Sequence, residues 1–300
     1  MAMKHVEIIH NPGAGDERFG EKELIALLEE NGFACNYYST KEKNWKDFST
    51  KTDLLLVAGG DGTIRKVAEE ILESKLINRP NPVALLPLGT ANNITKSLGV
   101  EGDPKPIIEC WKFGKTKNYD VGRVYNVADG KFFLESFGYG VFPYLMQEMK
   151  KAGEREDATP EENLQRALEF LHQIILSYEP KECRLEVDGT DHSGKFLLAE
   201  IMNIPSIGPN LLISPLSDPG DGEFEIVLVP EQHKEKFATY VEGKLKGLEE
   251  TYSFHTLKGK NISISWEGTH VHLDDQIVKL EKGVEVKIQI KKGLLEFLVP

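Results

Sequence analysis

Apolar and polar positions in the first 100 residues follow two alternating periods. The runs KHVEIIH (4–10), DLLLVAGG (53–60) and PVALLP (82–87) have the length of strands, and the second is apolar throughout, as in a strand covered on both faces. Between them, residues 21–32 and 61–72 space their apolar side chains three and four positions apart, which is the spacing of a helical stripe. This alternation predicts a doubly wound α/β domain with a parallel sheet.

The pattern changes after about residue 120. Short strand-like segments separated by turn residues fill the remainder of the chain, with helices expected near 160–178 and 231–246. Segments of this kind predict an antiparallel β-sandwich. We therefore expect an α/β domain over residues 1–120 and a β-sandwich domain over residues 121–300. The expected strands are GRVYNV, KFFLESFGYGV, CRLEVDG, KFLLAEIMN, FEIVLV, HTLKGKNISISW, HVHL and VEVKIQI.

Composition narrows the class of protein. The mean hydropathy of the 300 residues is −0.33, and no apolar run approaches the ~18 residues of a membrane span. A net charge of −12 argues against a nucleic-acid partner and against broad attachment to anionic lipid. Three scattered cysteines, Cys35, Cys110 and Cys183, favour a reducing compartment, so we expect a cytoplasmic protein.

Three glycine-containing loops follow predicted strands of the first domain. The carboxyl ends of parallel strands meet at one edge of a sheet, where ligands bind in open α/β folds. Bare backbone at this edge can approach a ligand closely, and helix N-termini favour anions. The loops therefore predict a nucleotide site. Their residues are Asn11, Pro12, Gly13, Ala14 and Gly15; Gly59, Gly60, Asp61, Gly62 and Thr63; and Gly89, Thr90, Ala91, Asn92 and Asn93.

Asp61 is the informative residue of the second loop. The loop lacks the GxxxxGK[ST] pattern, and Arg65 stands where a dinucleotide fingerprint needs its third glycine. A carboxylate in this place can cap the helix that follows. Beside phosphates it would repel them unless a cation intervenes, so it also indicates Mg²⁺ or an acceptor hydroxyl.

These loops carry a resemblance to a known family. VAGGDGTIRKV (57–67) resembles the GGDGT signature of the diacylglycerol kinase catalytic domain, and PLGTANNITKSLG (87–99) resembles its GTANDFA segment. IIHNPGAG (8–15) resembles the NPxxG of the family, and LLAEIMN to FEIVLV (197–229) resembles the stretch that ends in DG. The motifs occur in the family order over nearly the whole chain. They look most similar to the soluble bacterial lipid kinases, which are related to sphingosine kinases.

The resemblance implies that ATP and a lipid meet between two domains, and that the C-terminal strand near residues 293–300 returns to the first domain. Transferred by position, Asn11 to Gly15, Thr40, Gly59 to Arg65 and Thr90 would surround ATP. Asp221, with backbone oxygens of Asp218 and Glu223, would hold Mg²⁺. Without the resemblance, DPGDGE (218–223) predicts first of all a tight turn.

The chain departs from the family at two acidic positions. In HLDDQIV (272–278), Asp274 fits the family's Asp-Gly-Glu, Asp275 replaces the glycine, and Gln276 replaces the glutamate that serves as base. An amide cannot accept a proton at neutral pH. Asn93 likewise replaces the acid of GTANDFA. Either Asp275 has become the base, or the chain has lost catalysis and kept binding.

We expect a Mg²⁺-dependent kinase of lipid metabolism that transfers the γ-phosphate of ATP to a lipid alcohol, diacylglycerol-like or sphingoid-like. Asp61, Asp274, Asp275 and Gln276 are its candidate catalytic residues. Transient contact with a membrane surface is expected, and a homodimer is left open. The alternatives are a catalytically degenerate nucleotide- or lipid-binding regulator and, more remotely, an NAD kinase or a sugar kinase of the phosphofructokinase type.

Overall fold

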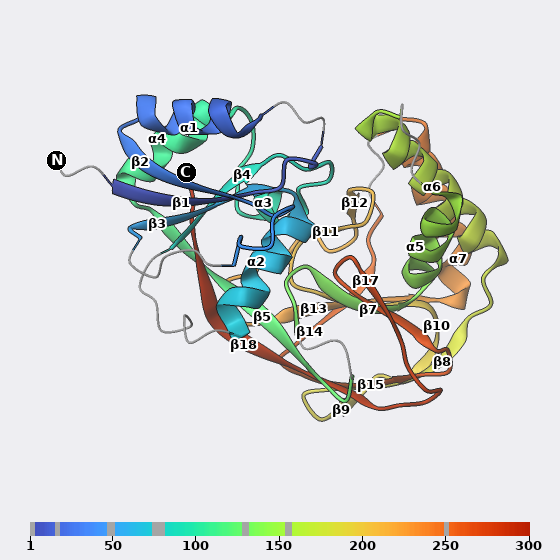
Figure 1. Cartoon of the computed structure of the whole chain (residues 1–300). Helices are drawn as coiled ribbons and strands as arrows, with labels where there is room; N and C mark the ends of the chain where they lie inside the picture. Colours follow the sequence, from blue (N-terminus) through green and yellow to red (C-terminus); the bar gives the residue numbers. More distant parts are fainter. Residues whose placement is uncertain are drawn as a thin grey trace. The chain divides into compact units, whose positions relative to one another are not determined.

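A computed structural model describes residues 4–15, 19–46, 52–73, 82–127, 132–153, 158–248 and 252–300 (Figure 1). The chain divides into two compact units, residues 1–119 with 293–300 (unit 1) and residues 120–292 (unit 2). It passes from one unit to the other within β5 (Thr116–Tyr125) and β18 (Val286–Leu298). None of the described helices is long and apolar enough to cross a membrane.

Unit 1 is built on a parallel sheet in the order β4–β3–β1–β2. β3 is buried at every position, as its apolar run predicts. The parallel sheet confirms the α/β part of the predicted fold. The strands are β1 (Lys4–His10), β2 (Phe33–Ser39), β3 (Leu54–Gly59) and β4 (Val83–Pro87).

Helices cover both faces of this sheet. In Figure 1, α1 and α4 lie on one side and α2 on the other. α1 buries Leu24 and Leu28, and α2 buries Ile64 and Val67, so each helix turns its apolar stripe toward the strands. The helices are α1 (Glu21–Glu30), α2 (Asp61–Glu73), α3 (Asn93–Ser97) and α4 (Pro104–Cys110), with the 3-10 helix η2 (Trp111–Phe113).

The end of β18 belongs to unit 1. Phe297 pairs with Val83 of β4 in parallel, and its ring meets Tyr119 edge to face with the ring centroids 5.2 Å apart. Val299 donates its backbone N–H to the carbonyl of Lys115 over 2.9 Å. The last residues of the chain thus complete the core of the unit that contains the first residues.

Unit 2 is mainly antiparallel. Its path runs β17–β16–β7–β10–β8–β15–β18, and β13 joins β10 on one side and β14 on the other. A separate ribbon joins β11 to β12. The strands are β6 (Phe132–Phe133), β7 (Ser136–Gly140), β8 (Lys181–Val187), β9 (Thr190–Asp191), β10 (Gly194–Met202), β11 (Ser206–Ile207), β12 (Leu211–Leu212), β13 (Phe224–Pro230), β14 (His255–Gly259), β15 (Asn261–Trp266), β16 (His270–Leu273) and β17 (Gln276–Lys279).

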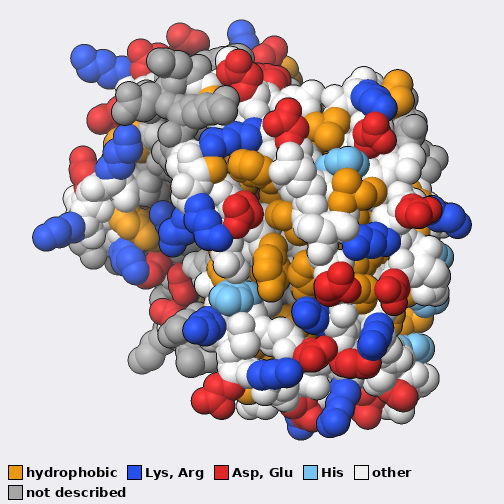
Figure 2. All heavy atoms as spheres, turned by 90° about the vertical axis from the view of Figure 1, so that its right-hand side faces the viewer, with side chains coloured by type: hydrophobic (Ala, Val, Ile, Leu, Met, Phe, Trp, Pro, Cys, Tyr) orange, Lys and Arg blue, Asp and Glu red, His pale blue; other side chains and the backbone are white. Residues whose placement is uncertain are grey.

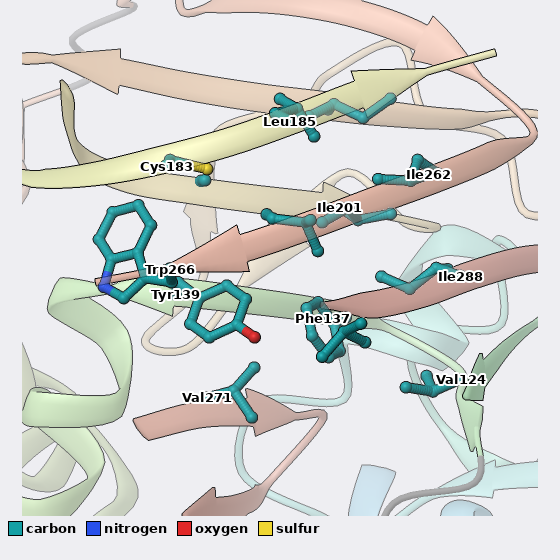
Figure 3. Packing of buried hydrophobic residues seen from close by; sticks show 14 of the residues in the cluster. Val124, Phe137, Tyr139, Cys183, Leu185, Ile201, Ile262, Trp266, Val271 and Ile288 are labelled. Carbon is teal, nitrogen blue, oxygen red and sulfur yellow. The ribbon is translucent and has the colours of Figure 1, made fainter. Parts of the chain in front are cut away.

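Two apolar cores lie on the two faces of these strands. One is a β-only core in which side chains such as Phe137, Tyr139 and Trp266 interdigitate, with Tyr139 stacked on Trp266 (Figure 3). The other is covered by α5 (Val141–Ala152), α6 (Pro160–Ser177) and α7 (Lys234–Leu245), the last preceded by η3 (Glu231–His233). The sandwich-like arrangement confirms the predicted fold class of this half.

Unit 2 differs from the sequence prediction in several elements: HTLKGKNISISW forms two strands, β14 and β15, and the short strands β9, β11, β12 and β17 were not expected. α5 was not predicted, because Val141, Phe142 and Leu145 prolong an apolar run that periodicity alone assigns to the preceding strand. The single strand expected over KFFLESFGYGV is interrupted between β6 and β7, at Leu134 and Glu135. The backbone N–H groups of this interruption bind a side chain of the β16–β17 hairpin, as described below.

Phe297→Ala should destabilise unit 1. The side chain is 2% exposed, and truncation of a buried phenylalanine costs about 3–5 kcal/mol because it leaves a cavity. Urea unfolding followed by fluorescence measures the loss. Phe113→Ala is the matched control, since Phe113 is 85% exposed and its truncation should change the free energy of unfolding by less than about 0.5 kcal/mol. Equal effects of the two variants would contradict the assigned packing of β18.

Candidate active site

The loops after β1, β3 and β4 meet at one edge of the unit 1 sheet. Backbone hydrogen bonds tie them together where the strands end. Asn11 donates its N–H to the carbonyl of Ala58 over 3.0 Å, and Leu88 donates to the carbonyl of Gly59 over 3.1 Å. The predicted juxtaposition of the glycine loops is therefore present in the structure.

Glycine permits a close approach between two of these loops. A methyl group added at Gly89 would collide with the Cα atom of Gly60, and one added at Gly60 would lie 3.0 Å from the Cα atom of Gly89. A methyl group at Gly15 would collide in the same way with the carbonyl oxygen of Leu88. The backbones of all three loops thus lie against one another without intervening side chains.

Small polar side chains complete this edge. The Asn11 amide donates to the Thr63 hydroxyl over 3.3 Å, and its oxygen accepts from the N–H of Gly13 over 3.2 Å. Asn92 makes two bonds to Gly89, accepting from its N–H over 3.0 Å and donating to its carbonyl over 2.7 Å. Asn92 has a φ of 52°, in the left-handed region that asparagine tolerates. These bonds stabilise the backbone conformation of the first and third loops.

Asp61 joins the second loop to the third. Its two carboxylate oxygens accept from the backbone N–H groups of Asn93 and Ile94, over 2.9 and 3.0 Å. A carboxylate at this position can cap the helix that Asp61 itself begins, but these bonds lie at the N-terminus of α3. The carboxylate therefore anchors the turn that carries Gly89 to Asn93, a role that sequence reasoning missed.

The other residues predicted to bind the nucleotide differ in their exposure to solvent. Thr40 is held at the end of β1 by an N–H bond to the His10 carbonyl over 2.8 Å. Burial and then the charge of Lys41 lower the pKa of His10, so that its ring is neutral near pH 7. Arg65 and Asn93 are buried, Pro12 and Gly62 are half-buried, and Thr90 and Gly13 are exposed.

The predicted catalytic residues of unit 2 occupy a tight hairpin. β16 and β17 pair from His270–Lys279 to Leu273–Gln276, with Asp274 and Asp275 as the turn. The carboxylate of Asp274 accepts from the backbone N–H groups of Leu134, Glu135 and Ser136 over distances from 2.8 to 3.2 Å. Asp274 is only 9% exposed and has a φ of 51°. Asp275 and Gln276 are exposed.

A buried ionisable pair lies beside this hairpin. The Nε2 atom of His272 lies 2.9 and 3.1 Å from the two carboxylate oxygens of Glu200 in β10. His272 and Glu200 are not among the site residues predicted from the sequence. The available signal was Glu200 itself, a single acid within the apolar run KFLLAEIM. His270, by contrast, contacts the neighbouring Thr269 hydroxyl over 3.2 Å.

The turn predicted to hold Mg²⁺ is surrounded by lysines. Lys292 donates its ammonium to the Asp221 carbonyl over 3.2 Å, and the Lys258 ammonium lies 3.6 Å from the Asp221 carboxylate. Glu223 donates its N–H to the same carboxylate over 2.9 Å. Asp120, which was not predicted, is buried and accepts from the N–H of Gly222 over 2.7 Å.

These side chains do not by themselves fit a metal site. Within the described ranges, no group of three or more His, Cys, Asp or Glu side chains is arranged to hold a metal ion. Asp218 faces its own turn, where its carboxylate accepts from the N–H of Gly220 over 2.9 Å. Mg²⁺ at Asp218, Asp221 and Glu223 stays a prediction, and it would depend on backbone oxygens.

Two family descriptions match the chain, one in each half. Residues 5–124 match the diacylglycerol kinase catalytic domain, and residues 154–275 match the YegS C-terminal NAD kinase beta sandwich-like domain. The first range contains all three glycine loops. The second ends at Asp275, within the hairpin turn. The order of these domains agrees with the α/β and sandwich halves of the structure.

Related proteins from two bacteria are named diacylglycerol kinase. A diacylglycerol kinase of Bacillus subtilis is 27% identical over 306 residues, covering 97% of this chain and 88% of its own length. One from Staphylococcus aureus is 24% identical over 234 residues, covering 75% of this chain and 70% of its own length.

Solved structures show the same fold. A diacylglycerol kinase from Bacillus anthracis superposes with a TM-score of 0.72 at 21% identity, covering 100% of this chain and 98% of its own. An NAD kinase from Archaeoglobus fulgidus in complex with ATP reaches a TM-score of 0.52 at 12% identity, covering 98% and 93%. Together with the matched domains and relatives, these likenesses agree with the resemblance found in the sequence, and residues 5–124 of the chain are a diacylglycerol kinase catalytic domain.

Proposed function

We propose that this protein is an ATP-dependent lipid kinase that transfers the γ-phosphate of ATP to the hydroxyl of a lipid alcohol, diacylglycerol-like or sphingoid-like. The contact between the three glycine loops is the observation that carries the proposal, because it presents bare backbone at the edge of an α/β sheet where phosphates bind. The matched catalytic domain and relatives named diacylglycerol kinase support it.

In this proposal the loops of unit 1 bind and orient the nucleotide. Asn11, Gly13, Gly60, Gly89 and Thr90 lie on these loops, and the Asp61 carboxylate keeps the third loop in place through α3. Mg²⁺ bound with ATP would supply charge neutralisation at the transferred phosphate. Positioning and electrostatic stabilisation account for most of the rate in phosphoryl transfer, so a rigid set of loops suits this chemistry.

The hydroxyl that attacks the phosphate must lose a proton. The Asp274 carboxylate already accepts three backbone N–H groups, which restricts its freedom to move toward a substrate hydroxyl. Gln276 cannot act as a base. Asp275 is the exposed acid of the same turn, and the turn frees it from the strict alternation of a strand. We therefore assign proton acceptance to Asp275.

The second candidate function is a nucleotide- or lipid-binding regulator without catalysis. Gln276 and Asn93, two amides where the family has acids, favour it. The NAD kinase alternative rests on likeness of fold, which does not identify a substrate. Offering NAD in place of lipid to the purified protein with ATP separates that alternative directly.

The lipid has to be reached from a membrane or another carrier. α5 and α6 expose the apolar side chains Tyr144 (43%) and Leu176 (54%), and the β11–β12 region exposes Leu212 (43%) and Leu216 (78%). Figure 2 shows apolar side chains gathered between acidic and basic ones on one face. Transient contact with a membrane surface stays a prediction, to which these exposed side chains give a structural basis.

Gly89→Ala should weaken ATP binding. The added methyl group collides with the backbone of Gly60, so the loops must separate, and overpacking of this kind costs about 1–3 kcal/mol. If the whole cost is borne by binding, the Kd measured by calorimetry should rise roughly 5- to 150-fold. Gly20→Ala is the control, because its methyl group would meet only the mobile end of the Glu23 side chain within the same 4 Å range. An unchanged Kd for Gly89→Ala would rule out this placement of ATP.

A screen of lipid alcohols with labelled ATP, read by thin-layer chromatography, tests the kinase assignment. We expect slow phosphorylation of diacylglycerol by the wild type. Gln276→Glu tests where the base lies, since general-base catalysis contributes roughly 10²–10⁴-fold: a rise of this size would place the base at position 276, and no rise would agree with a base at Asp275. The variant changes one exposed side chain and should leave the fold intact.

Asp275→Asn identifies the base in the same screen. We expect it to abolish turnover on the preferred lipid while Asp275→Glu retains part of it. Full activity of Asp275→Asn would refute the assignment of Asp275. If ATP binds but neither the wild type nor Gln276→Glu phosphorylates any lipid, the regulator is the correct reading.

Exchange of Mg²⁺ for EDTA tests the turn at residues 218–223. If Mg²⁺ binds at Asp221 as predicted, the melting temperature of the protein without nucleotide should fall when EDTA removes the metal, and Asp221→Asn should lower it in Mg²⁺ and make it insensitive to EDTA. A wild-type melting temperature that already ignores EDTA would refute the metal and leave Lys258 and Lys292 as the positive charges beside Asp221. Glu231→Gln, an exposed acid outside the turn, serves as the charge-matched control.

A further inference from the structure

His272 and Glu200 lie in one row of paired residues that crosses three neighbouring strands of unit 2. His272 of β16 is paired with Gly138 of β7, and Gly138 is paired with Glu200 of β10. Strands two places apart are separated by roughly 10 Å, so side chains on them normally have another side chain between them. Here the residue between them in the row is Gly138, which has no side chain.

Gly138 is what allows the two side chains to meet. A methyl group added at Gly138 would collide with the Glu200 carboxylate. Its neighbours in β7 and β16, Phe137, Tyr139 and Val271, belong to the β-only core (Figure 3). Since side chains alternate along a strand, His272 and Glu200 lie on the opposite face, toward the helices. The contact between His272 and Glu200 therefore depends on the strand pairing and on the glycine at position 138.

The pair is closed off from water. The side chains of His272 and Glu200 are 2% and 0% exposed. From α5, the Phe142 ring lies against His272 with ring centroids 6.2 Å apart, and α5 carries its charged residues Glu148, Lys150 and Lys151 at partly or fully exposed positions. From β17, Ile277 is the residue paired with His272. Glu200 and Asp274 are the charged groups that act on the imidazole.

The hydrogen bonds of His272 require a proton between it and Glu200. Its Nδ1 atom lies 3.0 Å from the backbone carbonyl of Asp274, which can only accept, so Nδ1 carries a hydrogen. Its Nε2 atom faces both carboxylate oxygens of Glu200. A neutral imidazole paired with an ionised carboxylate would set a lone pair against a negative charge. The pair therefore holds one further proton, which belongs to both residues.

The electrostatic balance agrees with this geometry. Burial alone lowers the pKa of His272, but the Glu200 carboxylate and the Asp274 carbonyl and carboxylate outweigh it, and the pKa is raised. The carbonyl that accepts from Nδ1 belongs to the turn residue whose carboxylate binds the interruption between β6 and β7. Asp275 and Gln276 follow it directly in the chain.

We propose that His272 is a positioning residue, which together with Glu200 holds the Asp274–Asp275 turn through a shared, buried proton. The turn presents the side chains to which the lipid kinase function assigns proton transfer, so the catalytic part of this inference rests on that function. The protonated pair acts on the backbone of Asp274 and touches no reacting atom. Gly138, Glu200 and His272 form one unit with this role.

Three variants of the full-length chain separate this role from mere packing. Glu200→Gln replaces the carboxylate with an amide that can donate to a neutral His272, so both hydrogen bonds of the ring persist without the shared proton. His272→Gln cannot bridge Glu200 and the Asp274 carbonyl with the same geometry. His270→Gln is the control on the same strand, because His270 is partly exposed and contacts its neighbour Thr269.

Nitrogen-15 NMR of the imidazole and hydrogen exchange of residues 270–279 are the direct readouts. We expect wild-type His272 to show protons at both nitrogens at pH 7, and Glu200→Gln to show one, at Nδ1. Amide exchange in the hairpin should rise at least tenfold in His272→Gln and stay at the wild-type level in His270→Gln. A wild-type His272 with a bare Nε2, or equal exchange in both histidine variants, would overturn the proposal.

The pH dependence of stability has a defined sign. A raised pKa in the folded protein means that the shared proton stabilises the fold fully below the unfolded-state pKa of about 6.5, and that this stabilisation is lost as pH rises through the folded-state pKa. The melting temperature of the wild type minus that of Glu200→Gln should therefore be largest near about pH 6 and should shrink at higher pH. A difference that grows with pH would contradict the shared proton.

Activity on the preferred lipid gives the last readout. We expect His272→Gln to lower kcat by roughly 10²-fold through misplacement of the turn, with an unchanged KM for ATP, and His270→Gln to leave both unchanged. A loss confined to KM for ATP would overturn the positioning role. If the wild type phosphorylates no lipid, the kinase function fails, while the NMR and exchange results still decide whether the pair holds the turn.

Discussion

Close approach of backbones at glycine is the constraint on which the functional parts of this structure depend. At the edge of the unit 1 sheet, Gly89 and Gly60 bring two loops into direct contact, and Gly15 does the same toward Leu88. In unit 2, Gly138 has no side chain to stand between β16 and β10, so His272 and Glu200 can contact each other. In each case a single methyl group would separate parts that come from distant segments of the chain.

Two aspartates expected to act in catalysis are engaged with backbone N–H groups. Asp61 accepts from the first residues of α3, and Asp274 accepts from the interruption between β6 and β7. Such bonds are strong because the acceptor is charged. Both residues thus fix the loops that carry the other candidate residues, and the proposed function gives the role of proton acceptor to the exposed Asp275.

Positive charge in unit 2 is supplied in two ways. Around the turn at residues 218–223, the exposed ammonium groups of Lys258 and Lys292 approach Asp221, where water screens the interaction. Around Glu200, where no solvent reaches, the balancing charge is a proton held by His272. Desolvation explains the difference, since an unpaired carboxylate is tolerated at the surface but is costly in the interior.

The sequence alone determined the fold class, the family and the meeting of three glycine loops at one edge of a sheet. It could do so because apolar periodicity distinguishes strands from helices, and because parallel strands bring their carboxyl ends together whatever their order. The tertiary structure decided which side chains meet. The bonds of Asp61 to α3 span 32 positions, and that of Glu200 to His272 spans 72. Contacts at such separations depend on how distant segments are placed in the fold, and the contact of Glu200 with His272 depends also on strand register and on the missing side chain at Gly138. A local stretch of sequence does not show which residues pair across strands.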